Sequence, residues 1–507
     1  CRRHDVMSPA NDHPSEGLEP SDGSPHEDTS MPERGDILEL TVESTGFEGT
    51  SIARHDGMVV FVEGAVAGDV VRAQIFKSKK KHLEAKVVEV LQASPTRTQP
   101  RCKYFGTCGG CKWQHVQYES QLAFKRQHVI DALERIGGFK GVDVLPIIAS
   151  KEIYFYRNKL EFSFGDQKWL TTPPPTPPLE GRGEKDGVGG GLALGFHVPQ
   201  RYDKILDINE CHLQSALSNG ILNAVREFSL NNSLPVYTSE PQSGYLRNLV
   251  IREGKNTGDV IVNLVTFDDR PDEMEKLTSI LTKAFPEIIT VVNNITSKRA
   301  NVAVGEIEKV YYGSGVISEK IGVHVFHLSA NSFLQTNTRQ AETLYAITKE
   351  YAELKLTDVV YDLYCGTGAI SIYISDAVKQ VVGIELIESS IANARMNAAQ
   401  NGITNCEFIA GDLKDLLTKD VEWKKNYAKP DVLIVDPPRS GMHPKAVKKI
   451  GEMKIPRVVY VSCNPATLAR DLQMLAPFGY SIEKVQPVDM FPHTYHIESV
   501  AKLVLRG

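Results

Sequence analysis

The chain has 507 residues, 41% hydrophobic and 24% charged, a composition typical of a globular protein with several domains. It has no run of about 18 apolar residues and no charged-then-apolar leader, so we expect a cytoplasmic protein without a membrane span or secretion signal. The net charge of −6 arises in residues 1–33, and the remainder holds 55 basic and 55 acidic groups. We predict that residues 1–33 form a disordered acidic tail, which does not exclude a nucleic-acid partner for the folded body.

Short β-rich runs alternate with glycine turns in residues 34–91 and predict a small antiparallel β-barrel. Between the last two predicted strands lies the segment "KSKKKH", with Lys77, Lys79, Lys80 and Lys81. A charge run is most often a solvated loop. At a loop tip of a barrel it also suits contact with the phosphates of a nucleic acid.

Residues 92–324 mix strands and helices and predict a central α+β domain. Apolar residues at near-helical spacing predict a helix over 118–138. The Pro- and Gly-rich segment 171–191 cannot form a core, so we expect a disordered insertion between two strands.

Four of the eight cysteines form a pattern of three close thiols, Cys102, Cys108 and Cys111, with Cys211 much further along the chain. In a chain without a secretion signal, clustered cysteines are more often metal ligands than disulfides. Four thiolates suit zinc or a [4Fe–4S] cluster, and their spacing alone does not choose between these two metal centres. The spacing is not the C-x3-C-x2-C of radical S-adenosylmethionine enzymes, in which the cluster supplies an electron. We therefore expect the centre to be structural.

Strands and helices alternate from about residue 325 to the end, which predicts a doubly wound, mostly parallel sheet over 325–507. The predicted strands are "VVYDLY", "QVVGIEL", "CEFIAGD", "DVLIVDPP" and "RVVYVSC".

Acidic residues at successive strand ends predict a cofactor site. Asp362 precedes Gly366 and Gly368 at a strand-to-helix turn, where glycines permit close approach of the backbone to a ligand. Glu385 ends the next strand, placed to bind ribose hydroxyls, and Asp412 follows the third, within reach of an adenine edge. No third glycine completes a dinucleotide motif, so S-adenosylmethionine fits better than NAD.

Several segments match one known pattern: "CGGC", "YRNKLEFSF", "SFLQTN", "DLYCGTG", "IVDPPRSG", "VSCNPATLARDL" and "DMFPHTYHIESV". On these segments the chain resembles the RNA (uracil-5-)-methyltransferases, in particular the 23S ribosomal RNA type with a TRAM barrel and an iron–sulfur centre. The resemblance implies a TRAM barrel, a central RNA-binding domain with a [4Fe–4S] cluster at the four cysteines, and a Rossmann-like S-adenosylmethionine-dependent methyltransferase domain. It implies methylation of carbon 5 of a specific uridine in 23S ribosomal RNA, giving 5-methyluridine.

The chemistry of this reaction explains the residue types. Carbon 5 of uracil attacks a methyl donor only after a thiolate has added at carbon 6, and a base must then remove the carbon 5 proton. The resemblance assigns the nucleophile to Cys463 and the base to Glu498, with His493 or His496 as alternative bases. Asp436 is predicted to belong to the cofactor pocket, where it would also hold the polar edge of the uracil or position the ring.

The resemblance also places Gln335 and Tyr364 in the cofactor pocket. Three alternatives stay open: the same chemistry on transfer RNA, a non-catalytic RNA-binding or assembly factor, and methylation of an exocyclic amine. Amine methylation also uses Asp-Pro-Pro but needs no nucleophilic cysteine, so Cys463 separates the two chemistries. We expect a monomer.

Overall fold

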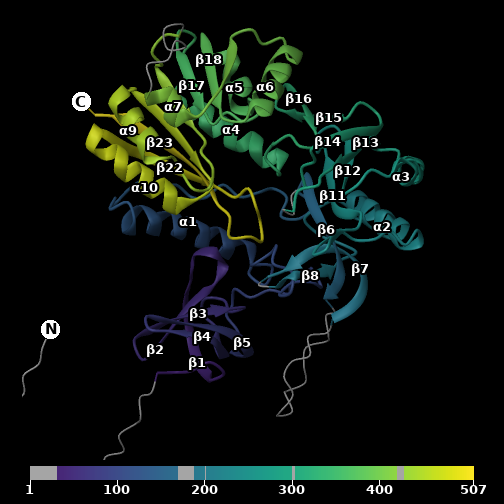
Figure 1. Cartoon of the computed structure of the whole chain (residues 1–507). Coiled ribbons are helices and arrows are strands. Elements are labelled where there is room, and N and C mark those ends of the chain that lie inside the picture. The colour runs from purple at the N-terminus through teal and green to yellow at the C-terminus, as the bar shows by residue number, and fades with distance from the viewer. Residues whose placement is uncertain (1–30, 170–187, 200, 300–302, 419–426, 507) are drawn as a thin grey trace, which may run out of the picture.

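The computed structural model describes residues 31–169, 188–199, 201–299, 303–418 and 427–506. A small barrel, a central sheet with two helices and a C-terminal layered unit follow one another along the chain (Figure 1). Nearly all of the predicted acidic tail and most of the predicted disordered insertion lie outside the described residues.

The N-terminal strands form a closed barrel in the order β1-β2-β3-β5-β4. Their bounds are β1 Ile37–Thr45, β2 Ser51–His55, β3 Met58–Glu63, β4 Val70–Lys79 and β5 His82–Gln92. The predicted barrel is confirmed, but the prediction that it is antiparallel throughout is wrong, because β3 and β5 pair in parallel. A closed ring with an odd number of strands cannot alternate direction at every junction, so one parallel pair is unavoidable.

The lysine run lies mostly within the barrel strands. Lys77 and Lys79 belong to β4, and their ammonium groups lie 3.0 and 3.5 Å from the carboxylate of Glu84. Only Lys80 and Lys81 occupy the turn between β4 and β5, so the loop tip offers two lysines rather than four.

The central unit is a seven-stranded sheet in the order β14-β13-β12-β11-β6-β7-β8. The bounds of these strands are β6 Lys159–Trp169, β7 Val188–Val198, β8 Arg201–Asp207, β11 Leu246–Glu253, β12 Val260–Thr266, β13 Ile288–Ile295 and β14 Ile307–Tyr312. The helices α2 (Ala216–Asn231) and α3 (Pro271–Ala284) pack on one face, and β9 (Thr238–Ser239) and β10 (Gln242–Ser243) form a small separate hairpin.

The described end of the predicted disordered insertion is ordered. Residues 188–191 form the start of β7, where Val188, Gly189 and Gly190 pair with Trp169, Lys168 and Gln167 of β6. A strand pairs through backbone groups and so does not need large side chains, which is why the glycine-rich composition did not predict it.

The C-terminal unit is a seven-stranded sheet in the order β19-β18-β17-β20-β21-β23-β22, with helices on both faces (Figure 1). Its five parallel strands are β17 Val359–Leu363, β18 Gln380–Glu385, β19 Cys406–Ala410, β20 Val432–Val435 and β21 Arg457–Ser462. The remaining strands, β22 (Tyr480–Val488) and β23 (Glu498–Leu505), are antiparallel to their neighbours.

The faces of the C-terminal sheet are buried in two separate cores. One core contains α4 (Thr338–Ala352), α5 (Ala369–Ile374) and α6 (Glu388–Gln400), together with the hairpin β15 (Val316–Ile321) and β16 (His324–Ser329). The other contains α7 (Leu413–Thr418), α9 (Pro444–Met453) and α10 (Pro465–Leu475). Because both faces are buried, the strands are almost continuously apolar.

Helix α1 (Tyr118–Arg135) connects the units. Its Val129 and Leu133 pack in the second core of the C-terminal sheet, and His128 Nε2 lies 2.8 Å from the carbonyl oxygen of Thr45 in the barrel. The division proposed from the sequence counts this helix with the central domain, whereas it lies between the barrel and the C-terminal sheet (Figure 1). Among the helices of the described residues, none is long and apolar enough to cross a membrane.

Candidate active site

The carboxyl ends of the five parallel strands meet at one edge of the C-terminal sheet. Glu385 ends β18, Asp412 lies two residues after β19, Asp436 directly follows β20 and Cys463 directly follows β21. Ligands bind at this edge in open α/β folds. The sheet therefore brings together side chains that lie far apart in the sequence.

The turn that carries Cys463 is rigid. Asn464 caps α10, with its side chain accepting a hydrogen bond from the amide of Ala466 (3.0 Å), and Pro465 opens the helix. The side-chain amide of Asn464 and the hydroxyl of Thr467 donate to the carbonyl oxygen of Arg439. The strand thus breaks after Cys463 because a helix must begin there, and the turn is tied to the Asp-Pro-Pro-Arg loop.

Glu498 reaches the same edge from the opposite direction. Strand β23 lies between β21 and β22 and runs antiparallel to β21, with Ser462 opposite Ser499. This register places Glu498 next to Cys463, one at the start of β23 and the other just past the end of β21. Glu498 is buried, with 3% of its surface exposed.

Burial and the nearby acidic groups disfavour the thiolate of Cys463. Burial, followed by the nearby carboxylates of Glu498 and Asp436, raises the pKa of Cys463 to about 12, against a smaller opposing effect of Arg439. Burial also raises the pKa of Asp436 to about 7 and that of Glu498 well above its usual range, the latter with a contribution from Asp436. A carboxylate whose pKa is raised is a stronger proton acceptor than an exposed one.

The glycine turn after β17 forms one wall of the cofactor site. Tyr364, Gly366 and Gly368 all have positive φ values, of 64°, 55° and 79°. The amide of Gly366 donates to Glu385 Oε2 at 3.2 Å, which fixes this carboxylate at the sheet edge. A Cβ on Gly368 would lie 3.0 Å from Ala394 and Phe408, so the turn packs closely on its surroundings.

Asp362 lies beneath the glycine turn rather than on its surface. It is fully buried, its Oδ2 accepts a 2.6 Å hydrogen bond from the Ser371 hydroxyl, and its Oδ1 has no partner among the described residues. Burial raises its pKa to about 7, and the charge of Asp436 acts in the same direction. The unpartnered oxygen and the close turn fit a polar ligand at this position.

A small cavity of about 70 Å³ opens at the ends of β18 and β19. Tyr364 and Asp412 line it, together with Leu386 and His443. The pocket combines apolar walls with a carboxylate, which can accept a hydrogen bond from the amino group of an adenine ring.

The segment that carries Gln335 reaches the glycine turn from outside the sheet. The main-chain carbonyl oxygen of Gln335 accepts a hydrogen bond from the side chain of Asn158 (2.9 Å), and the main-chain carbonyl oxygen of Phe333 accepts one from the hydroxyl of Thr367 in the turn (3.0 Å). The segment 333–335 is therefore held between the central sheet and the cofactor loop.

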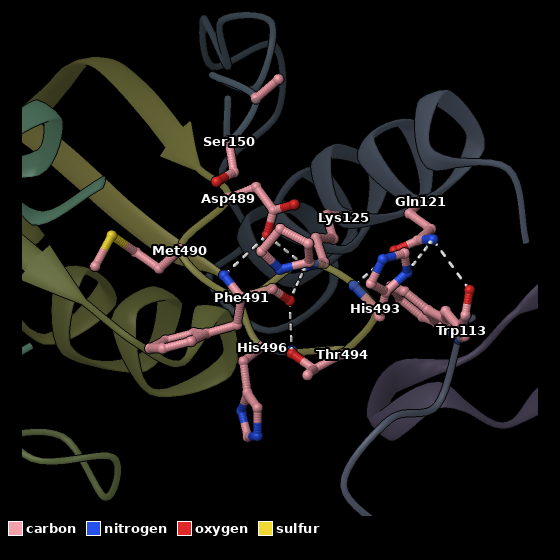
Figure 2. A network of polar contacts seen from close by, with 12 residues as sticks. Trp113, Gln121, Lys125, Ser150, Asp489, Met490, Phe491, His493, Thr494 and His496 are labelled. Atoms are coloured by element: carbon pink, nitrogen blue, oxygen red, sulfur yellow. Dashed lines mark hydrogen bonds and ion pairs between the residues drawn. The ribbon is translucent and has the colours of Figure 1, made fainter. Parts of the chain in front are cut away.

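The loop between β22 and β23, which leads to Glu498, is held by a buried network that the sequence did not indicate (Figure 2). Lys125 Nζ of α1 lies 2.6 Å from Asp489 Oδ1, with both side chains completely buried, and donates to the carbonyl oxygen of Phe491 at 3.0 Å. Tyr118 donates to the other Asp489 oxygen at 2.8 Å. The network fixes the start of the loop that delivers the candidate base.

His493 and His496, the alternative bases, lie in the same loop. Gln121 accepts from the amide of His493 at 2.9 Å and contacts its Nδ1 at 3.2 Å, and the ring of Tyr154 stacks on it at 4.3 Å. Burial lowers the pKa of both histidines to about 4, which makes them weaker proton acceptors than Glu498. His493 is thus a structural residue of the loop in this arrangement.

The four cysteines of the predicted metal centre lie within electrostatic reach of one another. Burial raises the pKa of Cys108 to about 11 and that of Cys111 to about 12, and Cys211 and Cys102 contribute to both increases. The donor types fit a metal centre, and the electrostatic contacts show that Cys211 returns to the other three. The four thiols do not surround a common point: within the described ranges, no three His, Cys, Asp or Glu side chains lie close enough together to hold a metal ion.

Similarities to known proteins agree with this geometry. A family model described as tRNA (Uracil-5-)-methyltransferase matches residues 257–505, and the TRAM domain model matches residues 33–88. An uncharacterized RNA methyltransferase of Chlorobaculum tepidum is 44% identical over 92% of this chain and 96% of its own length. The chain belongs to the RNA (uracil-5-)-methyltransferase family.

Other members extend over nearly the whole length of this uracil-5-methyltransferase. An uncharacterized RNA methyltransferase of Porphyromonas gingivalis is 41% identical over 92% of this chain and 99% of its own. The structure of the Pyrococcus abyssi tRNA (uracil-54, C5)-methyltransferase with S-adenosyl-L-homocysteine aligns with a TM-score of 0.70 and 29% identity, covering 92% of this chain and all of that one. As a family member, the present methyltransferase uses S-adenosylmethionine to methylate RNA.

Proposed function

We propose that this enzyme methylates carbon 5 of a uridine in 23S ribosomal RNA through a covalent bond between Cys463 and carbon 6. The observation that carries the proposal is the register of β23 against β21, which sets Glu498 beside Cys463 at the ligand-binding edge of the sheet. A thiol and a carboxylate side by side provide the nucleophile and the proton acceptor that this reaction needs.

The steps follow from the protein's own groups. S-adenosylmethionine supplies an electrophilic methyl group on a positively charged sulfur, and that charge favours the thiolate of Cys463. The thiolate adds to carbon 6 of a uridine turned out of the RNA, so that carbon 5 gains electron density and takes the methyl group. Glu498 then takes the carbon 5 proton, the electrons of that bond re-form the double bond between carbons 5 and 6, and Cys463 leaves as the thiolate.

The pocket residues have matching roles in this proposal. Tyr364, Asp412, Glu385 and the glycine turn bind the nucleoside part of the cofactor, Gln335 and Asp362 complete the cofactor pocket, and Asp436 lies at the reacting centre. Asp436 faces both Cys463 and Glu498 electrostatically, which suits a contact with the polar edge of the uracil ring.

Transfer RNA is the second candidate substrate. The TRAM barrel supports an RNA substrate of either class, and the similarity to a tRNA (uracil-54, C5)-methyltransferase over 92% of the chain supports transfer RNA, whereas ribosomal RNA rests on the family resemblance of the sequence motifs. A cytoplasmic location and a monomeric state stay predictions.

The test is to incubate the purified protein with S-adenosylmethionine and RNA that contains 5-fluorouridine. Fluorine at carbon 5 cannot leave as a proton does, so the adduct should persist on a denaturing gel and map to Cys463 by mass spectrometry. An adduct on a 23S transcript but not on transfer RNA supports the first substrate, and the reverse supports the second. No adduct on either RNA contradicts the proposed chemistry.

Replacing Glu498 by Gln should stall the reaction after methyl transfer. The amide keeps the shape of the side chain but cannot accept the proton, so we expect the turnover number to fall by about 10²- to 10⁴-fold. Ordinary uridine RNA should then remain bound to Cys463, visible as a slowly decaying covalent complex. A Glu498→Gln variant that turns over normally would assign proton removal to another group.

We further propose that Cys102, Cys108, Cys111 and Cys211 hold a [4Fe–4S] cluster with a structural role, with zinc as the alternative. The mutual electrostatic contacts of the four thiols support a shared site. Anaerobically purified protein should contain iron and acid-labile sulfide and absorb visible light, and a Cys211→Ser variant should lose both. Zinc without sulfide would establish the alternative.

A further inference from the structure

A second cavity, of about 390 Å³, lies between the central sheet and the segment that carries Gln335. Three cationic side chains line it, Arg157, Lys159 and Arg252, together with the carboxylate of Glu161. Lys159 Nζ lies 2.7 Å from Glu161 Oε1, so this pair is largely neutral and the two arginines leave the cavity positively charged.

Arg252 is the unusual member of this group. Only 3% of its surface is exposed, and Nη2 donates to the carbonyl oxygen of Ser332. Its Nε and Nη1 have no hydrogen-bond partner among the described residues. A buried guanidinium with unpartnered N–H groups is costly, so the arrangement indicates that another group completes it.

The nearby carboxylates of Glu161 and Glu319 act on Arg252 through their charge, but neither accepts a hydrogen bond from its guanidinium among the described residues. Glu319 accepts hydrogen bonds from the amides of Lys255, Asn256 and Lys320 and from the hydroxyl of Thr338. Its acceptor sites are therefore in use, although its charge still acts on Arg252.

The strand register brings two of the positively charged side chains of the cavity close together. Arg252 of β11 lies directly opposite Lys159 of β6. Like charges at opposed positions destabilise a sheet, and burial together with Arg252 lowers the pKa of Lys159. A bound anion would relieve this repulsion.

The cavity is built into the fold next to the active site. The amide of Asn158 donates to the carbonyl oxygen of Thr336 at 2.8 Å, and the Asn158 side chain bonds to Gln335 and Thr338, so the walls are fixed to each other. Phe333, which is 63% exposed, also lines the cavity and offers an aromatic face.

We infer that this cavity binds a backbone phosphate of the substrate RNA next to the target uridine, with Arg252 and Arg157 as its ligands and Phe333 available to a neighbouring base. Guanidinium groups are well matched to phosphate oxygens, and single-stranded RNA is commonly held by stacking on aromatic side chains. The inference rests on the proposed function, because it takes RNA as the substrate.

The test compares Arg252→Gln and Arg157→Gln with Arg247→Gln. Arg247 is a matched control, since it lies on the same strand, is also 3% exposed and donates to the carbonyl oxygens of Thr296 and Lys298. Each protein is titrated with the RNA that the wild type methylates, at several salt concentrations, and separately with S-adenosylmethionine by calorimetry. Thermal unfolding reports on folding.

We expect Arg252→Gln to bind RNA about tenfold or more weakly, as for the loss of one charge-assisted hydrogen bond. The slope of log affinity against log salt concentration should fall by about one, while cofactor affinity stays the same. Arg157→Gln should also lower the RNA affinity and the salt slope. If Arg252→Gln does not fold, Arg157→Gln provides the test. Arg247→Gln should leave the salt slope unchanged.

Two results would overturn the inference. An unchanged RNA affinity and salt slope in both variants would show that no phosphate is bound there. A loss of cofactor affinity with a normal salt slope would assign the cavity to the carboxylate of the methionine group instead. If wild-type protein forms no adduct with any RNA, the proposed function fails, which is separate from either result.

Discussion

A Cys463→Ala variant is expected to bind S-adenosylmethionine and RNA with near wild-type affinity and to transfer no detectable methyl group. Without the thiolate, carbon 5 of uracil is not nucleophilic enough to react, so the rate should fall by at least about 10⁴-fold, as for other lost nucleophiles. Incorporation of a labelled methyl group into RNA measures this loss, and the 5-fluorouridine adduct should disappear with it.

Cys406→Ala is the matched control for this variant. Cys406 lies at the start of β19, and its sulfur lies 3.5 Å from the carbonyl oxygen of Ser371, so it is a thiol of the same sheet placed away from the carboxyl edge. We expect it to retain activity and adduct formation. Methylation by Cys463→Ala at the wild-type rate would instead favour an exocyclic amine as the acceptor.

The parallel half of the active site could be predicted because each of its parts is local. Strand β17 and its glycine turn, Glu385 at the end of β18 and Asp436 after β20 each follow a short apolar run. In a parallel sheet all such ends meet at one edge, so recognising the strands is enough to place the acids together.

The position of Glu498 depends on information that the local sequence does not contain. Its strand, β23, comes last in the chain and inserts between β21 and β22, which pairs Ser462 with Ser499. An insertion of this kind follows from the packing of the whole sheet and not from the composition of one strand. Only the family resemblance placed Glu498 near Cys463 before the fold was known.

Helix α1 shows the same division between local and distant information. Apolar spacing predicted a helix over 118–138, which begins at Tyr118 as expected but ends at Arg135, and Val129 and Leu133 are buried as expected. Lys125 lies on the same face, four residues before Val129, where an apolar residue would be expected. That position could have been noticed, but its partner Asp489 is 364 residues away and had no detectable link to it.

The pair of Lys125 and Asp489 is expected to be essential to the stability of the loop that leads to Glu498. Replacing Lys125 by Met leaves a buried, uncompensated carboxylate, which should lower the free energy of unfolding by about 3–5 kcal/mol. The double variant Lys125→Met/Asp489→Asn removes both charges while the amide keeps most of the shape, so it should recover a large part of this loss. Chemical denaturation of the wild type, Lys125→Met, Asp489→Asn and the double variant measures the coupling.

An exposed ion pair provides the comparison. Lys449 and Glu452 of α9 lie 3.2 Å apart on the surface, and Lys449→Met should change stability by no more than about 1 kcal/mol. If Lys125→Met is no more destabilising than this control, the buried pair does not hold the loop.

The loop also makes this pair a positioning device, because only eight residues separate Asp489 from Glu498. The double variant restores charge balance but loses the bond from Lys125 to the carbonyl oxygen of Phe491, so Glu498 should be less well placed even in a folded protein. Small displacements of a catalytic group are costly, which predicts a lower turnover number, a lower KM for RNA and accumulation of the covalent intermediate. A variant that merely unfolded would lose turnover, RNA binding and the covalent intermediate together, whereas a misplaced base slows only the release of Cys463.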